Sequence, residues 1–305
     1  MSTNFDNLMG WAGPRWADKA WESIGSSFPQ FKIVGQKSSS VGKTVRAWDV
    51  WRKVLGRDLN RVVQETGDCV GASMNDVAMT VQCVDIFSGD REQFEPLLIS
   101  FQYAHSRVAV GKNQLRGGAG SVGSWMAKTA TTGGFLQSTT PGVPPYSGKL
   151  SDRWGDDKDY DGITWRQFAD QADDHPIDKS ARITTWEALK DAVCNLNFGT
   201  IASNRGYEMK PRGGDRGFHR PSGTWSHQMS ILAISDDWVG IGNQWGDQHG
   251  RLVDLETGEL WPPGMLRVTR EDFEKKHLTR SAECFVFSGI KGFVDNSDLT
   301  DGLLI

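Results

Sequence analysis

The stretch QETGDCVGAS, residues 64–73, constrains this chain most, together with the apolar-periodic run that follows it as far as Phe87. In that run, apolar side chains recur at steps of three and four residues, which predicts an amphipathic helix. They are Val70, Met74, Val77, Val81 and Val84. Cys69 therefore lies at the first turn, where unpaired N–H groups and the helix dipole favour a thiolate. The stretch predicts a nucleophilic cysteine, and a buried thiol beside a capping Asp68 remains the alternative.

The bulk composition is that of an ordinary globular protein. A chain of 305 residues can bury a sizeable core, as one large domain or as two lobes. The net charge of -4 provides no basic surface of the kind that nucleic acid requires. Apolar runs such as residues 229–234 are too short for a membrane span, and the first ten residues lack a signal-peptide pattern. We therefore expect neither a nucleic-acid nor a membrane partner.

The four cysteines, at positions 69, 83, 194 and 284, are widely spaced and form no CxxC pair. This pattern argues against a disulfide framework and against a zinc site. A reducing compartment fits such a chain better, so the expected location is the cytoplasm or the interior of a virus particle. No cofactor is expected.

Two glycine-rich segments suggest nucleotide binding but do not match its motifs. In residues 35–44, six residues separate Gly35 from Gly42, where a phosphate-binding loop needs four. In residues 116–125, the glycines have GxGxxG spacing, but no clear strand precedes them and no suitable acidic residue follows. We interpret the second segment as a loop in which the backbone comes close to a ligand or to another segment.

The most acidic stretch is residues 151–162. Its residues Asp157, Asp159 and Asp161 match the first half of a calcium-binding loop, in which alternate carboxylates converge on the ion. The twelfth position, however, is Phe168 in place of the glutamate that completes such a loop. A solvated acidic loop is the default interpretation, and a calcium site is the alternative.

The pattern of hydrophobic residues changes along the chain. Helical periodicity dominates the first half, and short β-type runs follow from Gly199 onward. We therefore expect an α+β fold with two lobes and a cleft between them, which is a common place for a site. The expected divisions are an N-terminal extension (1–45), a mainly helical lobe with the cysteine helix (46–150), a mainly β lobe (151–290) and a C-terminal tail (291–305).

One histidine differs from the other five. His227 begins the apolar run 228–234, and Asn243 ends the next β-type run after a short turn. Two antiparallel strands joined by that turn can place the two side chains together, although a structural histidine is the alternative. The others are expected to face solvent or to lie in a mobile loop: His105, His175, His219, His249 and His277.

Taken together, these residues resemble the papain-like cysteine peptidases of the C1 type. That family has a glutamine before a Gly-x-Cys turn, the cysteine at the start of a long helix, a distant histidine, and an asparagine in Asn-x-Trp-Gly. The matching residues here are Gln64, Gly67, Cys69, His227, Asn243, Trp245 and Gly246. Residues 133–148 and 186–203 are similar to two further segments of the family. The resemblance implies a two-lobe fold with a helical lobe and an antiparallel β-barrel-like lobe.

The resemblance also implies a role for each residue. Cys69 would be the nucleophile, His227 the base and later the proton donor, and Asn243 the group that orients the imidazole. Gln64 and the backbone N–H of Cys69 would stabilise the oxyanion, although Gln64 lies one residue nearer to the cysteine than in the family. Trp245 would shield the hydrogen bond between histidine and asparagine. The substrate would be a peptide or a protein.

A second function remains open, because a fold does not establish an activity. The chain could be a structural or assembly protein, for example a virion component, built on a papain-like fold. In that case the tryptophan-rich residues 1–30 and the apolar tail 303–305 would dock it onto a larger assembly. A transglutaminase or a cell-wall amidase shares cysteine and histidine chemistry, but the GNQWG motif of residues 242–246 argues against both.

Overall fold

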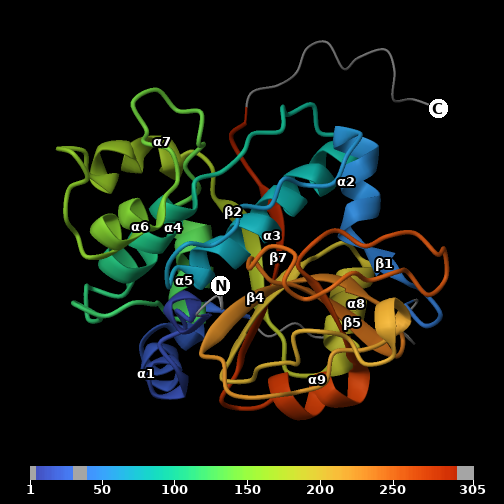
Figure 1. Ribbon diagram of the computed structural model, residues 1–305. Helices are drawn as coiled ribbons and strands as arrows, with labels where there is room; N and C mark the ends of the chain where they lie inside the picture. The colour runs from blue at the N-terminus through green and yellow to red at the C-terminus, as the bar shows by residue number, and fades with distance from the viewer. Residues whose placement is uncertain (1–4, 30–39, 294–305) are drawn as a thin grey trace.

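In the computed structural model, an antiparallel sheet and a set of helices surround one central helix, α3 (Cys69–Phe87) (Figure 1). The structure describes residues 5–29 and 40–293. Every α3 residue from Cys69 to Cys83 is buried, so the helix is covered on all sides and not on one face as its apolar periodicity predicts. The reason is its position, because α3 contacts the sheet through β4 (His227–Ile234) and also packs on helices.

The strands form one sheet in the order β2-β7-β3-β4-β5-β6, and the short strand β1 pairs with β4 outside this order. All pairs are antiparallel, as expected of the β lobe, and the sheet is open and does not close into a full barrel. The remaining strands are β1 (Val45–Arg46), β2 (Ile177–Arg182), β3 (Gly199–Ser203), β5 (Trp238–Gly242), β6 (Met265–Thr269) and β7 (Glu283–Ile290). The strands predicted from Gly199 onward are confirmed. Two strands were not predicted: β1 is only two residues long, and β2 carries polar residues at an edge of the sheet.

Helices α4, α6 and α7 lie together on one side of the molecule, whereas α8 and α9 lie beside the strands (Figure 1). The α-helices besides α3 are α1 (Pro14–Ile24), α2 (Ala47–Leu55), α4 (Ile99–His105), α5 (Gly123–Thr132), α6 (Gly148–Gly155), α7 (Ala169–Asp173), α8 (Trp186–Cys194) and α9 (Arg270–His277). A π-helical turn, Ser106–Val110, continues α4. No helix in the described ranges is long and apolar enough to cross a membrane.

The first part of the predicted acidic loop is helical. Residues 151–155 belong to α6, because Leu150 and Trp154 are buried on its inner side and Ser147 caps it by accepting from the backbone N–H of Leu150. Trp154 belongs to a second apolar cluster that also contains Phe101 of α4. The expected boundary at residue 150 stays a prediction, and residues just beyond it pack with the helices that precede it.

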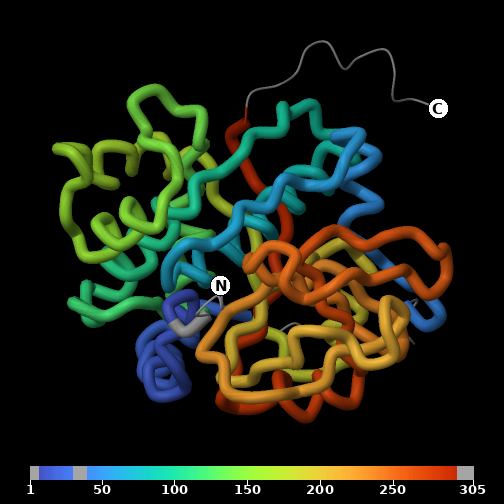
Figure 2. The backbone as a smooth tube through the Cα atoms, viewed as in Figure 1, coloured from blue at the N-terminus to red at the C-terminus, as the bar shows by residue number. Residues whose placement is uncertain are grey.

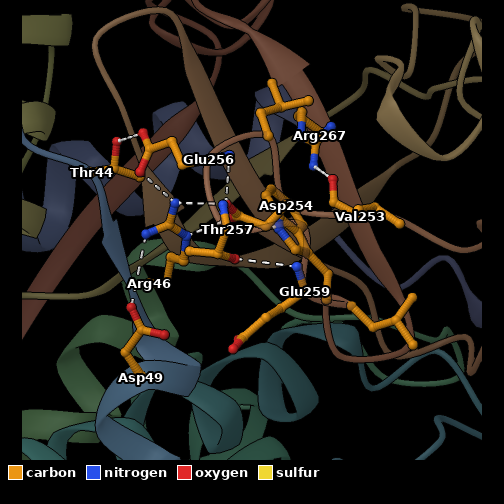
Figure 3. A network of polar contacts seen from close by, with 12 residues as sticks. Thr44, Arg46, Asp49, Val253, Asp254, Glu256, Thr257, Glu259 and Arg267 are labelled. Carbon is orange, nitrogen blue, oxygen red and sulfur yellow. Dashed lines mark hydrogen bonds and ion pairs between the residues drawn. The ribbon is translucent and has the colours of Figure 1, made fainter.

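A buried arginine network fixes the start of α2 to the loop before β6 (Figure 3). The guanidinium of Arg46 donates to both oxygens of Asp254, at 2.6 and 2.9 Å, and to Glu256 at 2.8 Å. Asp254 also accepts from the indole N–H of Trp261 at 3.0 Å. Burial alone would raise the pKa of Asp254, but these hydrogen bonds outweigh burial and hold it well below the usual range. The charged form of Asp254 therefore stabilises the folded state.

We predict that Asp254→Asn lowers the free energy of unfolding by about 3 kcal/mol at pH 7, since it leaves the buried Arg46 with only the more exposed carboxylates of Glu256 and Asp49 as partners. A depressed carboxyl pKa stabilises the fold above the unfolded value of about 3.9 and loses that contribution as the pH falls below it. The difference between the variant and the native chain should therefore shrink toward pH 3. Urea unfolding at several pH values measures it. Glu259→Gln, at an exposed carboxylate, is the control, and an equal loss in both variants would contradict the prediction.

Candidate active site

Cys69 is the first residue of α3, as the sequence predicts. The turn before it is tight, because a Cβ on Gly67 would lie 2.7 Å from the Cβ of Ala119. Asp68 precedes the helix, but its side chain makes no capping bond and accepts instead from the hydroxyl of Tyr146 at 3.0 Å. The cysteine is thus held by backbone packing at the buried start of α3.

His227 and Asn243 are brought together by the hairpin of β4 and β5. His227 is the first residue of β4, Asn243 directly follows β5, and Nε2 of the histidine lies 2.8 Å from Oδ1 of the asparagine. Because an amide oxygen only accepts, Nε2 carries the proton of the neutral ring and Nδ1 is left with a lone pair. Among the described residues, this buried Nδ1 has no hydrogen-bond partner.

The cysteine lies directly beside the start of β4. The backbone N–H of Gln228 donates to Sγ of Cys69 at 3.4 Å, and the side-chain amide of Gln228 donates to Oγ of Ser73 at 2.9 Å. These contacts fasten the first turn of α3 to the strand that carries His227. Cys69 thus lies beside the residue that follows His227, although Nδ1 of His227 makes no hydrogen bond to Sγ of Cys69 in the described structure.

His249, which was expected at the surface, completes this group. Nδ2 of Asn243 lies 2.7 Å from Nε2 of His249, so the asparagine is held from both ends. An amide nitrogen only donates, which makes His249 the acceptor and therefore neutral. Its position six residues after Asn243, in the loop that follows GNQWG, was the one signal available in the sequence.

The expectation for the other histidines was also wrong. His219, His249 and His277 are fully buried, His175 is nearly so, and His105 is half-buried. Their neighbours in the sequence are polar, but each ring finds a partner inside the protein. His277, for example, lies 2.9 Å from the hydroxyl of Ser203. Polar surroundings in the sequence did not mark exposed positions.

Trp245 lies against the histidine, in the place that a shielding role requires. The ring centroids of Trp245 and His227 are 4.7 Å apart, and those of Trp225 and Trp245 are 4.9 Å apart. The indole N–H of Trp245 donates to Oε1 of Gln64 at 3.3 Å. Both tryptophans are buried, so they keep water away from the histidine and its asparagine.

Gln64 reaches the site but points its donor at the N-terminal part of the chain. Its side-chain nitrogen donates to the carbonyl oxygen of Leu8 at 2.7 Å. An amide donor at this position can stabilise an oxyanion only after that carbonyl has left.

Residues 8–12, which we call the covering segment, cross the site between the helical side and the sheet (Figure 2). The carbonyl of Gly10 accepts from Ser121 at 2.7 Å, and the N–H of Trp11 donates to the carbonyl of Ser226 at 2.9 Å. A Cβ on Gly10 would lie 1.8 Å from the carbonyl oxygen of Gly67, so only glycine fits there. The glycine-rich run expected to approach another segment does so at Ser121.

Burial decides the protonation of Cys69 and His227. Burial raises the pKa of Cys69 to about 12, although the N–H groups of Gln228 and Gly10 act in the opposite direction. Burial also lowers the pKa of His227 to about 4, opposed by its bond to Asn243. The thiolate expected at the helix start is therefore not formed beneath the cover, because burial outweighs the helix terminus. Both groups are neutral near pH 7.

Two of the three calcium candidates, Asp157 and Asp159, are engaged with other groups. Asp157 pairs with Arg166, and Asp159 accepts from the N–H of Gly162 at 3.0 Å. Within the described part of the chain, no three acidic, histidine or cysteine side chains are arranged to hold a metal ion. All four cysteines are free in the structure.

Comparison with solved structures places the fold. The chain is similar to xylellain, a cysteine protease from Xylella fastidiosa, with a TM-score of 0.57, 14% identity and coverage of 86% of this chain and 92% of that one. It is also similar to procathepsin B S9 of Trypanosoma congolense (TM-score 0.55, 11% identity, coverage 87% and 83%). A third is digestive procathepsin L 3 of Tenebrio molitor (TM-score 0.53, 11% identity, coverage 93% and 77%). The fold is thus the papain-like α+β fold. No family model and no curated protein matched the sequence.

We predict that His249 makes stability depend on pH in the acid range. Burial lowers its pKa to about 3, so the unfolded chain binds a proton below about pH 6.5 that the folded chain does not. Stability is therefore lost as the pH falls, by up to about 1.4 kcal/mol per pH unit from this residue. His249→Gln keeps an acceptor for Asn243 but cannot titrate, so its free energy of unfolding should fall less steeply between pH 6 and pH 4. Identical slopes for both proteins would refute this.

Proposed function

We propose that this chain is a papain-like thiol hydrolase that cleaves peptide amide bonds with Cys69, His227 and Asn243. The observation that supports this most is the 2.8 Å bond from Asn243 to Nε2 of His227, which leaves Nδ1 without a partner in the described structure. Nucleophilic catalysis needs a base held in one tautomer near the thiol. His227 is such a base, and the next residue of its strand, Gln228, contacts the thiol. The similarity to cysteine proteases adds support at the level of the fold.

The reaction would proceed in two halves. Nδ1 of His227 takes the thiol proton, and Sγ of Cys69 attacks the amide carbonyl carbon while the carbonyl electrons move to oxygen. The side-chain amide of Gln64 and the N–H groups at the start of α3 would stabilise that oxyanion. When the C–N bond breaks, the imidazolium gives its proton to the leaving amine. Water then cleaves the thioester, with His227 again as the base, and the thiol is restored.

This chemistry requires the covering segment to leave. The carbonyl of Leu8 occupies the donor of Gln64, and Gly10 lies on the turn before Cys69. Removing the segment would rehydrate the site, so that the thiolate and the imidazolium could form as a pair. Two of the similar structures are named as procathepsins, which fits a chain whose own N-terminal part covers the site. We therefore propose that residues 8–12 keep the hydrolase closed.

The nucleophile is tested with an epoxide-type thiol inhibitor and mass spectrometry of the modified peptide. In the Gly10→Ala background, in which the added methyl is expected to open the cover, labelling of Cys69 should slow by at least about 100-fold when His227→Ala is added, since the base that forms the thiolate is gone. Cys83, Cys194 and Cys284 serve as internal controls for general thiol reactivity. Equal labelling of Cys69 with and without His227 would contradict the proposed base.

The cover is tested with Gly10→Ala, whose added methyl would collide with the carbonyl oxygen of Gly67. Labelling of Cys69 should become at least about tenfold faster, because the segment is displaced. Gly118→Ala is the matched control in the nearby glycine loop, since its Cβ would meet one atom at 3.8 Å and nothing closer. If Cys69 stays inert in a folded Gly10→Ala protein, the hydrolase proposal fails and the structural or assembly function becomes the better account.

A further inference from the structure

His249, in the loop after β5, is held against the asparagine of the site. Its ring stacks on Trp245 with centroids 5.9 Å apart, and the ring of Trp225 lies 6.0 Å away. Nε2 of His249 accepts from Nδ2 of Asn243 at 2.7 Å. The buried Nδ1 has no partner among the described residues, so within them this is the only hydrogen bond of the ring. The imidazole therefore serves one polar group, the amide of Asn243.

His219 ties the backbone of His249 to strand β6. Nδ1 of His219 accepts from the backbone N–H of Arg267 at 3.2 Å, so its Nε2 carries the proton. That nitrogen donates to the carbonyl oxygen of His249 at 2.9 Å. The backbone N–H of His219 also donates to the carbonyl of Arg267 at 2.8 Å. The acceptor that meets Asn243 is thus held in place through a regular strand.

The amide of Asn243 has an acceptor at one end and a donor at the other, so its orientation matters to the base. In the structure, Oδ1 faces Nε2 of His227. When His227 takes the thiol proton in the proposed reaction, both of its ring nitrogens carry hydrogen, and only Oδ1 can accept from Nε2. Nδ2 must then face His249. An acceptor is needed there, because a buried amide donor without one is unfavourable.

A charged His249 would have the opposite effect. Its ring would only donate, so the amide would turn Oδ1 toward His249 and Nδ2 toward His227. Nε2 of His227 would then have to accept, and its Nδ1 would carry the proton. No lone pair would remain to take the proton of Cys69.

The surroundings of His249 oppose this charged form. Burial lowers its pKa to about 3, so the ring is neutral at pH 7. Four ionisable side chains act in the same direction: His219, His227, Arg61 and Lys210. His249 therefore stays an acceptor at the pH at which His227 has to act as the base.

We propose that His249 is a positioning residue of the site. As a neutral acceptor, it holds Asn243 in the one orientation that the charged form of His227 allows. The part that concerns the reaction rests on the proposed function. The tautomers do not, because the amide between the two rings requires a proton on Nε2 of His227 and on Nδ1 of His249.

The tautomers are measured by ¹⁵N NMR of the histidine side chains in the full-length native chain at pH 7. His227 should carry its proton on Nε2, and His249 should carry its proton on Nδ1. The same tautomer in both rings, or the reverse assignment, would overturn the proposal. This measurement needs neither a substitution nor a reaction at Cys69, so it decides the matter even where a variant does not fold.

Two substitutions separate the acceptor from the bulk of the ring. His249→Leu removes the acceptor, so alkylation of Cys69 by iodoacetamide in the Gly10→Ala background should slow by at least about tenfold. His249→Gln offers an amide oxygen instead and should restore the rate to within about threefold of the Gly10→Ala parent. His175→Leu, at another buried histidine, whose ring stacks on Phe293, is the control and should leave the rate unchanged. Equal rates with leucine and glutamine at position 249 would overturn the proposal.

The same variants give a readout that is independent of the nucleophile. In His249→Leu, the proton of His227 should move at least in part to Nδ1, because an unpaired amide oxygen is tolerated better than an unpaired amide N–H. In His249→Gln it should stay on Nε2. An unchanged tautomer in a folded His249→Leu protein would defeat this inference alone, whereas an inert Cys69 with the expected tautomers would defeat the proposed function alone.

Discussion

The docking of the first turn of α3 onto the first residues of β4 is the contact on which the site depends. The N–H of Gln228 meets Sγ of Cys69, and the Gln228 side chain bonds Ser73 one turn further along the helix. Because α3 is buried on all sides and β4 lies in the middle of the sheet, neither element can shift alone. Cysteine and histidine come from distant parts of the sequence, yet they are set by the buried first part of α3 and by the fully buried strand β4.

The same burial explains why Cys69 and His227 are both uncharged in this structure. Desolvation disfavours charge on the thiol and on the imidazole. The covering segment lies against the turn before Cys69, so its departure would expose the site to water. The segment is anchored on both sides, at Ser121 and at Ser226, and by the indole of Trp11 on Glu283. Opening the cover and activating the nucleophile are therefore one event in this account.

Local signals in the sequence predicted the elements that carry the chemistry. The periodicity after Cys69 located α3, the β-type runs from Gly199 located the strands of the hairpin, and the short turn between them paired His227 with Asn243. Long-range packing could not be predicted in this way. The burial of His249, the helix α6 within the acidic stretch and the path of residues 8–12 all depend on contacts between distant segments. The docking role imagined for residues 1–30 stays a prediction, whereas residues 303–305 lie outside the described part of the chain.

The central claim is that the cover, and not the triad itself, keeps Cys69 protonated. The most direct measurement is the rate of Cys69 alkylation by iodoacetamide as a function of pH, followed by mass spectrometry in the native chain and in Gly10→Ala. The account predicts that the native rate stays low near pH 7 and rises only in alkaline solution, while the variant reaches its plateau near neutral pH. Superimposable pH profiles for the two folded proteins would contradict it.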